Sequence, residues 1–367
     1  MQLLKLKPVL YEYETFQDFI DDQKISAHDL ILSNAPILGN LLNDCGCEAQ
    51  VIYQEDYGRG EPDDVMVNKI IERIHSLDFD RLIAIGGGTV LDIAKILSVC
   101  GDETDVNDLY DHELTSHHEL IAIPTTCGTG SEVTNIAVVN RTKLHTKQGL
   151  VGDAMYPDRA VLISEFIKNL PYQFFATSSI DALIHAIESY LSPKATEYTQ
   201  MFATAAMSTI LPVYQHVAVE PDDYKEFGKL LFEASLNAGI SFSNAGCGLV
   251  HAMSYAFGGK YHVAHGESNY QFLMSVLRFY DLKDPDGFAP LKELLKDIFE
   301  NEEDPLESLS ALLENVLHYK PMHDYGATEA DLRPFAHSTY ANQQRLLANA
   351  FVSVDEEDIY DLYKDCL

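Results

Sequence analysis

The stretch Arg-Leu-Ile-Ala-Ile-Gly-Gly-Gly-Thr-Val-Leu-Asp-Ile-Ala-Lys, residues 81–95, decides the fold of this chain. Residues 81–85 are largely apolar, as is typical of a buried strand. Glycines 86–88 follow at once, and the apolar residues after Thr89 recur at helical spacing. We therefore predict a strand, a glycine turn and a helix, which is the repeating unit of a parallel sheet covered by helices.

The segments on both sides of residues 81–95 extend this pattern. We expect further strands at about 8–14, 30–33, 49–53, 120–123, 138–139 and 160–163, and a helix that opens at Pro62. Beyond residue 171 we expect helices at about 174–191, 196–218, 222–239, 243–257, 267–280, 288–300, 304–319 and 327–348. The prediction is an α/β domain over 1–166 with a parallel, Rossmann-like sheet, followed by an all-α domain over 167–367.

The composition limits the classes of partner. The chain has 57 acidic and 25 basic residues and a net charge of −32, so nucleic acid and anionic lipid would be repelled. No run of about 18 apolar residues and no signal peptide is apparent. We expect a cytoplasmic protein with no nucleic-acid or membrane partner. The six cysteines form no CxxC pair, which favours free thiols.

Two loops that follow predicted strands suit a phosphate group. In residues 86–89 the backbone amides and the helix dipole favour a pyrophosphate, although the GxGxxG pattern is absent because Leu91 takes the third glycine's place. The second loop, Pro-Thr-Thr-Cys-Gly-Thr-Gly-Ser-Glu (124–132), offers hydroxyls and flexible glycines. Open α/β sheets bind ligands at such strand ends. A structural turn is the alternative for the first loop, and structural hydrogen bonding is the alternative for Asp92 in the helix that follows it.

A second group of reactive side chains lies in the predicted helical domain. Asp181 and His185 are four residues apart and share one helix face, while His251 and His265 lie in the glycine-punctuated stretch 247–268. A buried carboxylate needs an opposite charge, and neutral imidazoles donate lone pairs to divalent ions. These four residues predict a metal centre for iron, zinc, nickel or manganese. The alternative is a set of core histidines with hydrogen-bond partners.

Segments 86–95, 124–134, 181–188 and the His251/His265 stretch together resemble the iron-containing (group III) alcohol dehydrogenases, in order and spacing, over nearly the whole chain. The resemblance implies the same two domains, in an architecture like that of dehydroquinate synthase. It implies Fe²⁺ as the metal, with Zn²⁺ or Ni²⁺ as alternatives, on Asp181, His185, His251 and His265. The cofactor residues that it implies are Gly86, Gly87, Gly88, Thr89, Thr125, Thr126, Thr129 and Lys147.

Two positions depart from the commonest pattern of that family. Tyr255 stands where many members have a histidine that takes part in proton transfer. We expect Tyr255 or His262 to move the proton, unless Tyr255 only lines the pocket. Asn34 stands where NAD-preferring members carry an acid for the ribose hydroxyls, but no arginine replaces that acid to attract a 2′-phosphate. We therefore expect NAD, with NADP as the alternative.

Within the family, segments 57–62, 124–135 and 251–255 most resemble the 4-hydroxybutyrate dehydrogenases. The resemblance implies reversible hydride transfer between a primary alcohol and its aldehyde, here 4-hydroxybutyrate and succinate semialdehyde, and we expect a homodimer. A substrate carboxylate needs a cation, for which Lys147 and Lys260 are candidates. The alternatives are another alcohol, such as 1,2-propanediol or butanol, and a metal-dependent lyase that uses bound NAD.

Overall fold

The computed structural model describes residues 2–39, 41–144, 146–300 and 302–367. The chain forms two compact units, one over Leu6–Leu170 and one over Pro171–Leu367 that also includes the N-terminal residues up to Lys5. The Lys5 amide donates to Asn244 Oδ1 at 2.6 Å, and Asn244 Nδ2 donates back to the Lys5 carbonyl at 3.0 Å. These bonds explain why the start of the chain belongs with the helices.

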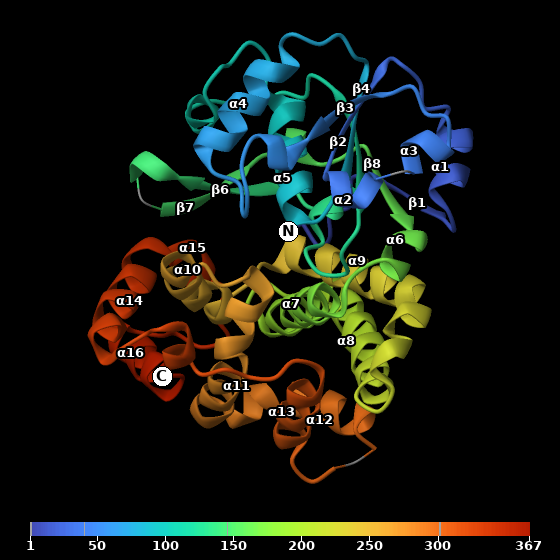
Figure 1. Cartoon of the computed structure of the whole chain (residues 1–367). Coiled ribbons are helices and arrows are strands. Elements are labelled where there is room, and N and C mark those ends of the chain that lie inside the picture. The colour runs from blue at the N-terminus through green and yellow to red at the C-terminus, as the bar shows by residue number, and fades with distance from the viewer. Residues whose placement is uncertain (1, 40, 145, 301) are drawn as a thin grey trace. The chain divides into compact units, whose positions relative to one another are not determined.

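The first unit is built on a six-stranded sheet in the order β1-β8-β5-β4-β2-β3 (Figure 1). Every neighbouring pair of strands in this sheet is parallel. The parallel sheet expected from the strand–helix alternation is confirmed. The strands are β1 (Val9–Tyr13), β2 (Asp29–Ser33), β3 (Gln50–Tyr53), β4 (Arg81–Gly86), β5 (Glu119–Pro124) and β8 (Arg159–Ile163).

Strand β4 is buried on both faces, as its unbroken apolar run predicts. Leu82 and Ala84 share a core with the apolar residues of α4 (Asp64–Ile74) and α5 (Gly88–Val99), while Ile83 and Ile85 are fully buried on the opposite face. The other helices of this unit are α1 (Phe16–Gln23), α2 (Ala35–Leu38), α3 (Leu41–Asp44) and α6 (Glu165–Lys168).

One predicted strand lies outside the main sheet. The apolar pair at 138–139 belongs to β6 (Ile136–Arg141), which pairs antiparallel with β7 (Thr146–Val151) as a two-stranded ribbon. Strand β7 is not predicted from the sequence, because that segment is mostly polar and lacks a buried strand's apolar run.

In the described residues of the second unit all regular structure is helical, so the expected all-α domain is confirmed. Helices α7, α8 and α9 pack against one another (Figure 1). The predicted helix at 243–257 is wrong at its start, because Gly246, with φ of 85°, ends α9 and α10 begins at Leu249. The helices are α7 (Tyr172–Leu191), α8 (Glu197–Val217), α9 (Gly228–Ala245), α10 (Leu249–Tyr261), α11 (His265–Lys283), α12 (Pro285–Ile298), α13 (Pro305–Val316), α14 (Glu329–Asn342), α15 (Gln344–Leu347) and α16 (Glu356–Asp365).

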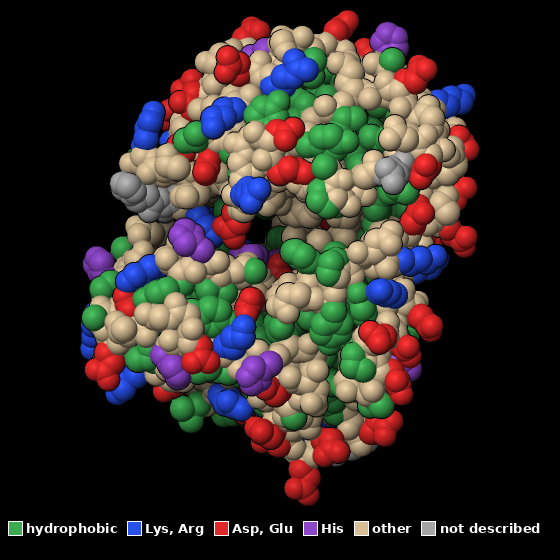
Figure 2. Space-filling model, in the orientation of Figure 1, with side chains coloured by type: hydrophobic (Ala, Val, Ile, Leu, Met, Phe, Trp, Pro, Cys, Tyr) green, Lys and Arg blue, Asp and Glu red, His purple; other side chains and the backbone are tan. Residues whose placement is uncertain are grey.

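The surface reflects the composition. Acidic side chains appear at many places on the face drawn in Figure 2, in keeping with the net charge of −32. Within the described part of the chain, no helix combines the length and apolar character that crossing a membrane requires.

Candidate functional site

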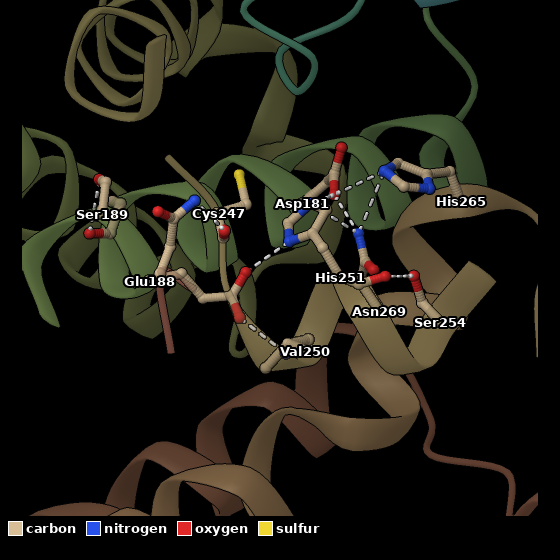
Figure 3. A network of polar contacts seen from close by, with 11 residues as sticks. Asp181, Glu188, Ser189, Cys247, Val250, His251, Ser254, His265 and Asn269 are labelled. Atoms are coloured by element: carbon tan, nitrogen blue, oxygen red, sulfur yellow. Dashed lines mark hydrogen bonds and ion pairs between the residues drawn. The ribbon is translucent and has the colours of Figure 1, made fainter. Parts of the chain in front are cut away.

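Three of the four predicted metal ligands meet in the helical unit. Asp181 of α7, His251 of α10 and His265, the first residue of α11, each contribute one ligand atom to a set whose atoms lie within 4.8 Å of one another (Figure 3). Asp181 and His251 are buried, whereas 36% of the His265 side chain is exposed. The set is therefore accessible to solvent on the side of His265.

Gly266 allows this close approach. A Cβ atom at Gly266 would lie 2.0 Å from the Thr177 carbonyl oxygen and 3.2 Å from Asp181 Cβ. Only glycine lets the start of α11 come so near to α7. Gly266 thus allows the close packing of α11 on α7 that places the preceding residue, His265, beside Asp181.

Asn269, one helical turn after His265, lies at the point where the three side chains converge (Figure 3). Its Nδ2 donates to Asp181 Oδ1 at 2.7 Å and lies 3.1 Å from His251 Nε2 and 3.3 Å from His265 Nε2. One carboxylate oxygen and two ring nitrogens therefore surround a single amide group. The same three atoms could serve as ligands of a divalent cation. Sequence reasoning missed Asn269, although its spacing from His265 places both on one face of α11.

Glu188 holds His251 in place. Its Oε2 lies 2.6 Å from His251 Nδ1, and its Oε1 accepts from the Val250 amide at 2.7 Å. Because an ionised carboxylate only accepts, the Nδ1 that faces Glu188 carries a proton, and Nε2 is the nitrogen that can donate a lone pair once the ring is neutral. Outer carboxylates of this kind orient metal-ligating histidines. Sequence reasoning missed Glu188, whose signal is its spacing of seven residues from Asp181 on α7.

His185 lies next to this set and belongs to a second one. Its ring stacks on Phe242 at 4.2 Å and on His251 at 4.8 Å between centroids. Among the described residues, His185, Cys247 and His251 form another trio with ligand atoms within 4.8 Å of one another. His251 is common to both trios. Cys247, expected from the sequence to be an ordinary free thiol, is therefore a neighbour of the candidate centre.

The charged side chains around Asp181 and His251 shift the pKa values of these two residues. Burial acts to raise the pKa of Asp181, but the charges of His185 and His265 outweigh it and hold that pKa well below its usual range. Burial acts to lower the pKa of His251, but Cys247 and Glu188 raise it well above the ordinary value. The buried carboxylate thus stays ionised and requires positive charge around it, which protons or a metal ion can supply.

The two candidate proton carriers lie in different environments. Tyr255 is one turn after His251 on α10, partly buried, and its ring centroid is 6.2 Å from that of His265. His262 caps the C-terminal end of α10 with a left-handed backbone, at φ of 54°, and is exposed. Of the two, Tyr255 is the one that contacts the surroundings of the metal-ligand set.

In the α/β unit, the two predicted phosphate loops lie against each other. The Thr125 amide donates to the Gly86 carbonyl at 3.0 Å. A Cβ atom at Gly88 would lie 2.8 Å from Thr129 Cγ2, and one at Gly87 would lie 3.5 Å from Thr126 Cγ2. The structure therefore brings both loops to the ends of β4 and β5, where α5 begins at Gly88. Bare backbone and hydroxyls at a helix start suit a pyrophosphate.

Asp92 and Lys95 tie these loops together. Asp92 accepts from Ser131 Oγ at 2.6 Å and from the Val138 amide at 2.9 Å. Lys95 is fully buried and donates to Thr134 Oγ1 at 2.7 Å. Burial lowers the pKa of Lys95 to about 8, against the opposing effect of Asp92. Both side chains are engaged with the protein, and for Asp92 this agrees with the structural alternative.

The remaining predicted residues each face a polar partner. Asn34 Nδ2 donates to Gln54 Oε1 and Glu55 Oε2, both at 2.9 Å. Thr89 Oγ1 donates to the Gly60 carbonyl at 3.4 Å. The two lysines considered for a substrate carboxylate form ion pairs, Lys147 with Glu61 and Lys260 with Asp331.

Comparison with known proteins gives a consistent result over the chain. A model of the C-terminal part of the Fe-containing alcohol dehydrogenase family matches residues 175–367, and a model of iron-containing alcohol dehydrogenase matches residues 27–164. The 4-hydroxybutyrate dehydrogenase of Clostridium kluyveri is 45% identical over 369 residues, which cover 99% of each chain.

Solved structures share the fold. The crystal structure of 1,3-propanediol oxidoreductase has a TM-score of 0.86 and 22% identity and covers 100% of both chains. Sulfoacetaldehyde reductase from Bifidobacterium kashiwanohense, solved in complex with NAD⁺, has a TM-score of 0.86 and 21% identity and covers 100% of this chain and 99% of its own. At these identities the two structures support the fold alone.

Proposed function

This chain belongs to the iron-containing alcohol dehydrogenase family, and from that premise we propose that it is a metal-dependent, NAD-linked 4-hydroxybutyrate dehydrogenase. The reaction is the reversible interconversion of 4-hydroxybutyrate and succinate semialdehyde. The carrying observation is the convergence of Asp181, His251 and His265 on one point, since a binding protein without metal chemistry has no need of that donor set. The identity of 45% to a 4-hydroxybutyrate dehydrogenase over the full length supports the substrate.

The proposed metal ligands are Asp181, His185, His251 and His265. Fe²⁺ is the proposed ion, and the same donors accept Zn²⁺ or Ni²⁺. A bound divalent ion supplies Lewis-acid charge that favours the deprotonated form of the alcohol. Glu188 faces Nδ1 of His251, so that Nε2 is the ring nitrogen that would hold the ion.

The proposed coenzyme residues are Gly86, Gly87, Gly88, Thr89, Thr125, Thr126, Thr129, Lys147 and Asn34. The glycine turn presents backbone amides to the pyrophosphate, and the threonine loop beside it offers hydroxyls. NAD supplies the hydride acceptor, and the protein supplies its position and electrostatic surroundings.

Tyr255 is the proposed proton carrier, with His262 as the alternative. The position of the Tyr255 ring beside His265 supports this order of preference, because a proton carrier must come within hydrogen-bond reach of the substrate, directly or through one water. The phenolate form of Tyr255 would accept the alcohol proton in the oxidative direction, and the resulting phenol would return it in the reductive direction.

The substrate carboxylate requires a cation, and the two lysines considered for it, Lys147 and Lys260, form ion pairs with Glu61 and Asp331. The test is a panel of 4-hydroxybutyrate, 1,2-propanediol, ethanol and butanol with NAD and with NADP, on protein reconstituted with Fe²⁺, Zn²⁺ or Ni²⁺. We expect the highest kcat/KM for 4-hydroxybutyrate with NAD. A higher value for an uncharged alcohol would contradict the substrate, and failure to consume NADH with any aldehyde would favour a lyase that uses bound NAD.

A further inference from the structure

We propose that Glu55 selects NAD over NADP, by holding a carboxylate at the place where the adenosine 2′-position of the coenzyme binds. The inference rests on the proposed NAD-linked function and concerns the α/β unit alone. Glu55 would supply the charge that NAD-preferring members of the family carry at the position of Asn34, where this chain has an uncharged amide.

The strand register brings Glu55 to the same edge as the glycine turn. Ser33 of β2 pairs with Ile85 of β4 on one side and with Tyr53 of β3 on the other, so the three strands end at one level. Ser33 Oγ also donates to the Ile85 carbonyl at 2.7 Å. Beyond this level the chain continues into the glycine turn after β4, Asn34 after β2, and the 3₁₀ turn Gln54–Asp56 after β3.

Neighbouring strands are about 4.8 Å apart, so the ends of β2 and β3 lie roughly 5 and 10 Å along this edge from the end of β4. With the pyrophosphate on the glycine turn, the adenosine ribose lies within one or two strand spacings of it. Asn34 and Glu55 follow the two strands on that side. Asn34 and Glu55 would therefore lie beside the hydroxyl groups of the adenosine ribose.

The hydrogen bonds around Glu55 fix its carboxylate there. Oε2 accepts from Asn34 Nδ2 at 2.9 Å, and Oε1 accepts from the Ala35 amide at 2.7 Å. Gln54, whose Oε1 also accepts from Asn34 at 2.9 Å, holds the other side of that amide. Asn34 thus acts as a positioning residue for Glu55, and the half-buried carboxylate keeps further lone pairs for ligand donors.

A fixed carboxylate discriminates between the two coenzymes by charge. Ribose hydroxyls donate to it, whereas the 2′-phosphate of NADP brings like charge against it and has to be desolvated there. Two other charged residues follow on the same segment, Asp56 and Arg59, and both are exposed. Asp56 provides a control of the same charge on the same turn. Arg59 represents the opposite possibility, in which an arginine attracts the 2′-phosphate of NADP.

The test is calorimetric titration of the full chain with ADP-ribose and with 2′-phospho-ADP-ribose, which measures binding independently of turnover. Glu55→Gln should lower the preference for ADP-ribose by roughly tenfold or more, because glutamine keeps an acceptor for Ala35 but carries no charge. Asp56→Asn removes the same charge from the same turn and should change the preference by less than about twofold. The double variant Glu55→Gln/Asn34→Asp should restore the preference, because the carboxylate returns on the neighbouring strand end.

Two results would overturn the inference. One is an unchanged preference for ADP-ribose in Glu55→Gln. The other is an equal loss of that preference in Asp56→Asn, which would mean that the overall negative charge of the turn, and not Glu55, causes the effect. A loss of 2′-phosphate binding in Arg59→Ala together with an unchanged Glu55→Gln would move the role to Arg59. If the wild-type chain binds neither ligand, the proposed coenzyme function fails as well, and that outcome is distinct from a failure of Glu55 alone.

Discussion

Glu188 Oε2 lies 2.6 Å from His251 Nδ1, and both residues are buried where α7 meets α10. The same carboxylate accepts the Val250 amide through its other oxygen. One acidic residue therefore sets both the start of α10 and the direction of the His251 lone pair. Glu188 therefore has a role beyond packing, because the orientation of a metal-ligating ring such as that of His251 affects how tightly the ion is held.

Replacing Glu188 by glutamine should weaken metal binding by about 10- to 100-fold, since an amide is a weaker acceptor for the His251 ring. Competition titration with a chromophoric chelator measures the affinity. Glu314→Gln is the matched control, because Glu314 pairs with the exposed His318 in a similar way on the surface. Equal affinities in wild type and Glu188→Gln would remove Glu188 from the metal centre.

His265→Ala should abolish metal-dependent turnover and leave ADP-ribose binding close to the wild-type value. His265 is one of the three converging donors, and the coenzyme loops belong to the other unit. Metal content after dialysis and calorimetry with ADP-ribose provide the two readouts. His337→Ala, an exposed histidine on α14, serves as the control. Normal activity of a metal-free His265→Ala protein would refute the metal assignment.

Gly88→Ala should weaken dinucleotide binding, because its Cβ would lie 2.8 Å from Thr129 Cγ2 and would force the two loops apart. Thr129→Ser removes that methyl group and keeps the hydroxyl, so the double variant should recover most of the affinity. Gly259→Ala is the control, since its Cβ would meet nothing within 4 Å. Equal binding by Gly88→Ala and wild type, measured from the fluorescence of bound NADH, would argue against a coenzyme at this turn.

Tyr255→Phe should lower kcat by about 100-fold if its hydroxyl moves the proton, with no change in metal content. Steady-state rates over a range of pH and metal analysis check this expectation. Tyr261→Phe on the same helix is the control, because that hydroxyl donates to Asp331 at 2.9 Å. An unchanged kcat would mean that Tyr255 only lines the pocket, and His262→Ala would then be the next variant.

Asp64→Asn should destabilise the α/β unit by about 1–3 kcal/mol at neutral pH. Asp64 Oδ1 accepts from Thr142 Oγ1 at 2.7 Å, which links α4 to the segment after β6. Burial acts to raise the pKa of Asp64, but the bonds from Thr142 and Asn107 outweigh it and lower that pKa below the ordinary value.

A depressed carboxyl pKa gives stability that is present above the unfolded-state pKa and is lost as pH falls through the folded-state pKa. The difference between wild type and Asp64→Asn should therefore shrink as the pH falls below about 4, and urea unfolding at several pH values measures it. Asp78→Asn, at an exposed position, is the control and should show no such trend. A constant difference down to acid pH would disprove this role of the ionised group.

The parallel sheet and the helical second unit could be read from the sequence because their signals are local. The apolar run of β4 followed by glycines, and the helical spacing of apolar residues after it, depend only on neighbours along the chain. Strand β7 was not predicted, because its segment is mostly polar and its pairing with β6 leaves no apolar run in the sequence. Asp181, His185, His251 and His265 stood out because their chemistry is unusual among apolar neighbours.

The sequence by itself determined the alternation of strands and helices that gives the parallel sheet, the two kinds of structural unit and the side chains able to hold a cation or a pyrophosphate. Only the tertiary structure decided that Asn269 lies where Asp181, His251 and His265 converge, that Glu188 orients His251, and that Glu55 stands beside Asn34. The physical reason is that these contacts join residues from different helices or different strand ends. Their distances depend on helix packing and strand register, which no local pattern of residues contains.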